Sequence, residues 1–311
     1  ILGNNITLNI IVGLLFMAVS LVFLDPILYF FGASEQTIPY AREYMIVILL
    51  GNVITHLYFG TNAVLRAASK PREAMYITIF TVVLNSILDP LFIYTFDMGI
   101  SGAAYATVLS QAIALVWQTR LFCNPKEMLH LKRGIYSIDL TIVKNILGIG
   151  VSPFAMNATA CLVSIFINQR LLQYGGDLAV GAYGIANRVA FIFIMINFGV
   201  NQGMQPIAGY NYGAQKFDRL MRVLKLAMIA GTCITTTGFL VAELMPGLCV
   251  KLFTDDAELS ARAVNGLRIM MAAMPIVGYQ MIVTNFFQSI GKAKISIFLS
   301  LSRQMLILIP M

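Results

Sequence analysis

Residues 6–31 read ITLNIIVGLLFMAVSLVFLDPILYFF, and Asp25 is the one charged residue among them. A helix needs about 20 apolar residues to cross the roughly 30 Å hydrocarbon core of a bilayer. Eight further stretches meet the same test, near residues 44–65, 74–96, 100–122, 147–170, 179–204, 222–244, 264–287 and 295–311. The sequence therefore predicts an all-α polytopic membrane protein with nine helices present.

The composition supports this class. Hydrophobic residues make up 59% of the 311 positions and charged residues 11%, whereas a soluble domain carries roughly 25% charged residues. So few charges cannot solvate the surface of a soluble protein of this size. The net charge of +7 does not indicate a nucleic-acid partner, because the basic residues form no patch with interleaved aromatic residues. We expect the lipid bilayer as a partner and no nucleic acid.

The basic residues predict the orientation of the helices. Lys and Arg are enriched in the cytoplasmic connections of membrane proteins. Fourteen of them lie in four alternate connections or in the helix turns next to these connections, against four at the others. The rich connections follow the stretches 44–65, 100–122, 179–204 and 264–287. We therefore expect a multi-pass protein of the cell inner membrane whose long polar connection faces the cytoplasm.

An internal repeat predicts the domain organisation. The run LRAASKPR at 65–72 resembles FQSIGKAK at 287–294, and a Thr-Asn pair shortly precedes each. Two copies separated by an even number of helices have the same orientation, as in transporters with parallel repeats. The repeat predicts two six-helix lobes related by a pseudo-two-fold along the membrane normal. Twelve helices are then expected, two of them before the first residue and one after the last.

The expected domains follow from this count. Residues 1–122 are the N-lobe and hold helices three to six of the full protein. Residues 123–146 are the cytoplasmic linker between the lobes. Residues 147–311 are the C-lobe and hold helices seven to eleven. We expect a monomer.

Three stretches together resemble one known family. They are QGMQPIAGYNYGA at 202–214, the run at 65–72, and NSILDPLFI at 85–93. Each resembles the multidrug and toxic compound extrusion (MATE) family of bacterial type, here truncated at both ends. The resemblance implies secondary active multidrug efflux, in which hydrophobic or cationic organic compounds leave in exchange for inward H⁺ or Na⁺ by alternating access.

Asp89 is the candidate for ion coupling, because it is an acid within a predicted membrane helix, and such residues mark ion pathways. Asn85 lies one turn before it on the same helical face. Pro90 removes a backbone donor and frees a carbonyl one turn back. The resemblance implies a cation site in this lobe and adds Asn62, Tyr44 and Thr107. The competing interpretation is that Asp89 caps a kink and faces the outer headgroups.

No other cofactor is expected, and the coupling ion is H⁺ or Na⁺. Four cysteines without CxxC spacing and two distant histidines favour no metal centre beyond Na⁺ at Asp89. The chain is not expected to be an enzyme. The single pair Asp255-Asp256 does not provide the two acidic clusters that Mg²⁺-dependent prenyl transfer would need.

The C-lobe provides candidates for a cavity that accepts many substrates. Flexible methionines and aromatic faces adapt to ligands of different shape, although each of these side chains could instead pack against lipid or a neighbouring helix. The candidates are Asn157, Phe191, Met195, Phe198, Met274, Tyr279 and Gln280.

A second group is interpreted as structural or gating. Arg188 lies in the middle of a predicted helix and needs a partner, and the 202–214 stretch has the Gly and Pro content of a tightly packed helix exit. The group consists of Arg188, Gln202, Gln205, Pro206, Tyr210 and Asn211.

One alternative function stays open, a flippase or exporter of lipid-linked saccharides from a related superfamily. A pyrophosphate substrate would predict a cavity lined with Arg and Lys, whereas only Arg188 and Arg303 qualify within the predicted helices.

Overall fold

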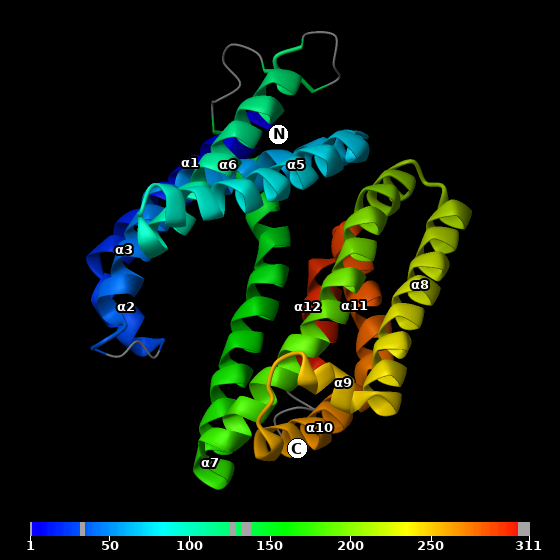
Figure 1. Cartoon of the computed structure of the whole chain (residues 1–311). Helices are drawn as coiled ribbons and strands as arrows, with labels where there is room; N and C mark the ends of the chain where they lie inside the picture. Colours follow the sequence, from blue (N-terminus) through cyan, green and yellow to red (C-terminus); the bar gives the residue numbers. More distant parts are fainter. Residues whose placement is uncertain (1, 32–34, 125–128, 132–137, 304–311) are drawn as a thin grey trace. The chain divides into compact units, whose positions relative to one another are not determined.

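A computed structural model describes residues 2–31, 35–124, 129–131 and 138–303. Every regular element in this part of the chain is a helix (Figure 1). The predicted all-α fold is therefore confirmed. The chain forms two compact units, with the boundary between Lys144 and Asn145.

Unit 1 is built on long helices that pack side by side. Helix α5 lies along α6, and α4 packs against both α1 and α6. Buried Leu65, Ile77 and Ala114 join α4, α5 and α6 near the end where α6 finishes, and Leu131 packs against this core. The elements are α1 (Leu2–Val22), α2 (Leu24–Phe30), α3 (Ile38–Leu50), α4 (Asn52–Ala67), α5 (Pro71–Pro90), the π-helical turn η1 (Leu91–Thr95) and α6 (Gly99–Phe122).

Unit 2 begins within a long element that contains a break. Gly176 has φ 66° and ψ −166°, a backbone conformation that glycine adopts without steric cost. It divides α7 into membrane-length parts, Leu140–Gly176 and Leu178–Gly213. Both parts are longer than the predicted stretches 147–170 and 179–204. The elements are α7 (Leu140–Gly213), α8 (Phe217–Leu244), α9 (Pro246–Lys251), α10 (Ala257–Ala272), α11 (Met274–Ser289) and α12 (Ala293–Arg303).

The order of elements repeats between the two units. In unit 1, α1 is followed by the short α2, and α3 and α4 are bent by 53° at Gly51. In unit 2, α8 is followed by the short α9, and α10 and α11 are bent by 46° at Ala273. Pro26 lies in the first short helix and Pro246 begins the second. The repeat found in the sequence is thus also a repeat of helix lengths and bends.

The helix ends repeat as well. Ser69 after α4 has φ 63° and Gly291 after α11 has φ 77°, and these left-handed residues lie 222 positions apart. Each is followed by a lysine whose N–H donates to the carbonyl five residues earlier, the pattern of a Schellman cap. The bonds are Lys70 N to Leu65 O at 3.0 Å and Lys292 N to Phe287 O at 2.9 Å. The resemblance between 65–72 and 287–294 therefore encodes one turn geometry used twice.

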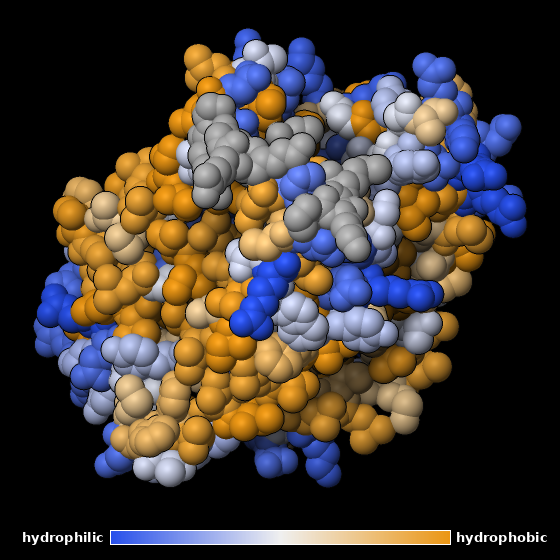
Figure 2. All heavy atoms as spheres, turned by 90° about the horizontal axis from the view of Figure 1, so that it is seen from above, coloured by the Kyte–Doolittle hydropathy of each residue, from blue (hydrophilic) through white to orange (hydrophobic). Residues whose placement is uncertain are grey.

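The surface of the helices is strongly apolar. Six helices are long and apolar enough to cross a membrane, or eight if each bent pair forms one span, within the described part of the chain. Large side chains such as Phe16 and Ile269 are 54% and 78% exposed, and Figure 2 shows broad hydrophobic areas on the face viewed. Exposed apolar area on this scale indicates contact with lipid. Of the ninth predicted stretch, 295–311, residues 304–311 lie outside the described residues.

Candidate cation-coupling site

The backbone around Asp89 departs from regular α-helix because of Pro90. Proline has no N–H to donate to the carbonyl of Ser86, one turn earlier. The chain continues as the π-helical turn η1, in which Phe96 N donates to Leu91 O at 3.1 Å. Such wide turns occur often at functional sites because they expose backbone groups. The free carbonyl lies one turn before the π-turn and close to Asp89 in the sequence.

Helix α6 approaches this turn closely because it carries glycine there. A Cβ atom at Gly102 would come within 2.8 Å of the carbonyl carbon of Phe92. A real Cβ does not come so close to backbone atoms, so a larger residue would push α6 away from η1. The absence of a side chain at Gly102 therefore allows Thr107, further along α6, to reach α5.

Three of the five predicted site residues come together. The Asn85 amide nitrogen donates to Asp89 Oδ1 at 3.1 Å and approaches Thr107 Oγ1 at 3.4 Å. The Thr107 hydroxyl in turn donates to Ala103 O at 3.0 Å. All three side chains are half-buried. Within the described part of the chain, Asp89 Oδ2 and Asn85 Oδ1 have no hydrogen-bond donor, so a carboxylate oxygen and an amide oxygen are free to contact a small cation.

Asn62 lies elsewhere. Its amide donates to Ala74 O at 3.1 Å and approaches Thr78 Oγ1 at 3.3 Å, and its own oxygen accepts from Arg66. These partners belong to the first turns of α5 and the last turn of α4. Thr78 and Asp89 are 11 residues apart on α5, which corresponds to roughly 16 Å along a helix. The structure does not bring Asn62 to Asp89.

Tyr44 is also apart from the three residues. It lies on α3, which packs on α6, and is half-buried. No hydrogen bond joins it to Asn85, Asp89 or Thr107 in the described residues. The resemblance to a family indicated which residues to consider. Whether two of them meet depends on how far one helix is shifted along its neighbour, and packing decides that shift.

Polar pairs that were not predicted from the sequence join α4 to α6. Thr55 Oγ1 donates to Gln111 Oε1 at 2.6 Å, and Thr61 Oγ1 donates to Gln118 Oε1. Gln118 is fully buried, and its Nε2 has no partner among the described residues. The seven-residue spacing of Gln111 and Gln118 places both on one face of α6, which is the signal that could have identified the pairs.

In unit 2, the residues assigned a structural or gating role lie on the second part of α7. Gln205 Nε2 donates to Asn285 Oδ1 at 3.2 Å and so joins α7 to α11. Asn211 is buried and donates to Ile207 O at 2.8 Å. Gln202 and Pro206 are half-buried, and Tyr210 is exposed. Helix α7 continues through this whole stretch to Gly213.

Arg188 was predicted to need a partner within the membrane. Its side chain is exposed, and within unit 2 no ion pair or hydrogen bond to it occurs among the described residues. A buried contact between helices occurs about two and a half turns further along the same helix. Asn197, which is fully buried, donates to Gly278 O on α11 at 3.4 Å. The contact was not predicted, although an asparagine between Ile196 and Phe198 in an apolar helix is a signal for it, because polar side chains in membrane helices bond to neighbouring helices.

The predicted cavity residues divide into exposed and buried groups. Phe191, Met195 and Phe198 are 55%, 44% and 43% exposed and share one face of the second part of α7. Asn157 and Tyr279 are exposed too, and the Asn157 amide donates to Pro153 O.

Two of the candidates face inward within unit 2. Met274 is 4% exposed and packs in the core formed with Ala186 and Met271. The Gln280 amide donates to Leu299 O on α12. In this structure these two side chains contribute to packing between helices of unit 2.

The comparison with family models decides which family is present. The model of the MatE family matches residues 1–91 and 153–311. The chain belongs to the MatE family. The resemblance seen in the sequence is therefore confirmed, and the match covers both units.

Named relatives in the MatE family agree with this assignment. The chain is 27% identical over 286 residues to the multidrug export protein MepA of Staphylococcus aureus (strain N315), which covers 92% of this chain and 63% of that protein. It is 33% identical to the MATE multidrug transporter DinF-BH, solved in complex with a ligand, over 99% of this chain and 69% of that one, with a TM-score of 0.88. The chain thus spans about two thirds of the length of such relatives.

The fold matches more distant members of the MatE family equally well. A multidrug resistance MATE family transporter of the MOP superfamily, solved in an outward-facing conformation, superposes with a TM-score of 0.90 at 24% identity, over 97% of this chain and 68% of that one. At that identity the likeness concerns the fold alone. Together with the membrane-length apolar helices, family membership identifies the chain as part of a multi-pass membrane protein.

Proposed function

We propose that the protein exports hydrophobic or cationic organic compounds in exchange for inward H⁺ or Na⁺, by alternating access. The support is membership of the MatE family and similarity to proteins named for multidrug export or transport. The observation that carries the coupling is Asp89, an acid inside a membrane-length helix whose neighbours are hydrogen-bonding oxygen groups. A group there that changes charge or binds a cation can make the free-energy difference between two conformations of the transporter depend on the ion gradient.

In the proposed mechanism, each residue of the site has one role. Asp89 takes up the proton or provides the charged oxygen for Na⁺. Asn85 holds the carboxylate in place through Oδ1 and offers its own amide oxygen. Thr107 and the free carbonyl of Ser86 complete a set of hard oxygen groups of the kind that coordinate coupling ions at broken transmembrane helices. These groups fit H⁺ and Na⁺ alike.

The test compares two acidic residues of unit 1. The full-length protein is expressed in efflux-deficient cells, and ethidium extrusion is measured with an imposed ion gradient. We expect Asp89→Asn to lower gradient-driven extrusion at least about tenfold, since the site then has no titratable or charged group. Asp97→Asn is the matched control, because Asp97 is exposed with φ 52°, a conformation that asparagine tolerates.

Two outcomes would contradict the proposed coupling. Normal gradient-driven extrusion by Asp89→Asn would remove Asp89 from the mechanism. Equal loss in Asp97→Asn would show that the effect is not specific to the site. Separate experiments with a pH gradient alone and a Na⁺ gradient alone then identify the ion.

A further inference from the structure

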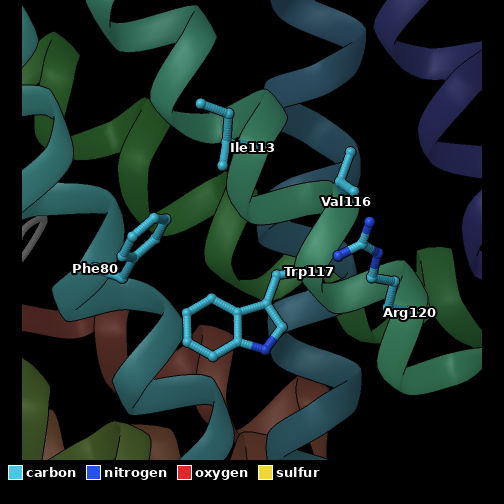
Figure 3. A pocket seen from close by; sticks show the side chains of 5 residues that line it. All are labelled: Phe80, Ile113, Val116, Trp117 and Arg120. Carbon is cyan, nitrogen blue, oxygen red and sulfur yellow. The ribbon is translucent and has the colours of Figure 1, made fainter.

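A shallow cavity of about 460 Å³ lies between α5 and α6 of unit 1 (Figure 3). Phe80 from α5 and Ile113, Val116, Trp117 and Arg120 from α6 form its walls. The Phe80 and Trp117 rings meet edge to face with centroids 5.4 Å apart. The cavity is therefore an apolar and aromatic groove with a single cation at one end.

Two polar groups of this cavity, on Arg120 and Trp117, have no partner among the residues that the structure describes. Among the described residues, neither the Arg120 guanidinium nor the Trp117 indole N–H donates a hydrogen bond, and both side chains are exposed. In Figure 3 the indole nitrogen lies on the side toward Arg120, opposite Phe80. Arg66 differs from Arg120, because it is half-buried and donates to Asn62 within the unit.

The position along α6 places these groups at the depth of a lipid headgroup. Helix α6 ends at Phe122, so Arg120 lies in its last turn and Trp117 about 4.5 Å deeper along the axis. Tryptophan favours the membrane interface, and arginine extends toward it. Ile113 lies about 6 Å deeper than Trp117, at the level of acyl chains. The orientation prediction assigns this end of α6 to the cytoplasm.

Other arginines of the chain form ion pairs with carboxylates. Arg262 pairs with Glu258 at 3.0 Å and Arg268 pairs with Glu243 at 3.6 Å, both near the predicted outer ends of their helices. Within the described chain no carboxylate lies within ion-pair distance of Arg120. As far as the described residues show, the charge of Arg120 is therefore available to an anionic ligand.

We propose that this cavity binds a phospholipid of the cytoplasmic leaflet that carries an anionic headgroup. The phosphodiester accepts hydrogen bonds from Arg120 and Trp117, because guanidinium groups match phosphate oxygens. One acyl chain lies along Phe80, Ile113 and Val116. The positive charge of Arg120 disfavours a cationic drug at this place.

Trp117 allows a direct test, since it is the one tryptophan among the 311 residues. The full-length protein, with any tryptophan outside this chain replaced by phenylalanine, is reconstituted with brominated phosphatidylglycerol or brominated phosphatidylcholine. Quenching of Trp117 fluorescence reports which lipid occupies the groove. We expect a preference of about fivefold for phosphatidylglycerol, the contribution of one basic residue near a membrane surface.

Variants distinguish lipid binding at the cavity from a general effect of basic residues on the surface. Arg120→Gln is expected to reduce the preference to about one, and Arg120→Lys to retain most of it, by the same charge argument. Arg72→Gln is the matched control, because Arg72 is exposed in the first turn of α5 outside the cavity and its loss should leave the preference unchanged.

Several results would overturn the proposal. They are equal quenching by both lipids in the wild-type protein, a preference that survives in Arg120→Gln, or the same loss in Arg72→Gln. Added inorganic phosphate that abolishes the preference would show a free-anion site instead. Size-exclusion profiles confirm that each variant is folded. Because the readout is lipid binding, its failure would not affect the proposed export activity, and failure of ethidium extrusion would not affect the lipid site.

Discussion

The Asn85 amide donates toward both Asp89 and Thr107, and this bridge defines the candidate site at the scale of single residues. An amide nitrogen has two hydrogens, so both contacts can be made at once. The Asn85 oxygen then remains available for a ligand. The pairing of Asn85 with Asp89 was predictable from their spacing of four. The exclusion of Asn62 was not, because it depends on Ala74 and Arg66 occupying its amide.

The two asparagines of unit 1 give a paired prediction. Asn62→Ala should lower the free energy of unfolding by about 1–3 kcal/mol, since Arg66 loses a buried acceptor, while the ion dependence of transport is retained. Asn85→Ala should change stability less and weaken ion-driven extrusion. Denaturation in detergent and ethidium extrusion measure the two effects. If Asn62→Ala abolished ion dependence at unchanged stability, Asn62 would belong to the coupling site after all.

At the scale of elements, single residues at helix ends and breaks determine the local backbone geometry. Pro90 produces a π-turn, Gly51 and Ala273 lie at bends, and a left-handed residue follows α4 and α11. A third such residue, Gln215 with φ 56°, ends the second part of α7, and Lys216 N donates to Asn211 O at 2.9 Å. The same cap therefore ends three helices, with serine, glutamine and glycine at the left-handed position.

This comparison predicts opposite effects at equivalent positions. Gly291→Ala should lower the free energy of unfolding by about 1 kcal/mol, because a side chain is strained at positive φ. Gln215→Gly should raise it, by somewhat less than that because glycine makes the unfolded chain more flexible. Thermal unfolding in detergent micelles measures both variants.

A helix-interior glycine controls for the general effect of adding a methyl group. Gly266 in α10 has open space where a Cβ would be placed. Gly266→Ala should therefore stabilise the helix by up to about 1 kcal/mol. Destabilisation by Gly266→Ala as large as that by Gly291→Ala would argue against strain at the cap.

At the scale of the whole molecule, each unit contains a long helix, a short helix and a bent helix pair in the same order, and each has membrane-length apolar helices. Three ion pairs, Asp25 with Arg42, Glu258 with Arg262 and Glu243 with Arg268, lie near the helix ends predicted to face outward. The basic residues of the predicted cytoplasmic connections follow the expected bias of membrane proteins. The orientation itself stays a prediction.

Cys123 offers a test of this orientation, because it is exposed at the end of α6. In a variant with Cys123 as the only cysteine, a membrane-impermeant maleimide should label it in inverted vesicles and not in intact cells. A single cysteine at exposed Asp255, between α9 and α10, should show the reverse. Labelling of Cys123 in intact cells would contradict the predicted orientation and would also move the proposed lipid to the outer leaflet.

The sequence by itself determined the membrane class, the helices, the repeat and the family. These depend on composition, on the length of apolar stretches and on local motifs such as NSILDPLFI, and each acts over one helix or one turn. Tertiary structure alone decided which side chains meet. Asn62 pairs at the start of α5, Met274 enters a core, and Phe80, Trp117 and Arg120 line one groove. The reason is that contacts between helices depend on where small residues such as Gly102 permit close approach. A periodic apolar sequence does not encode the position along each helix at which its neighbour comes close.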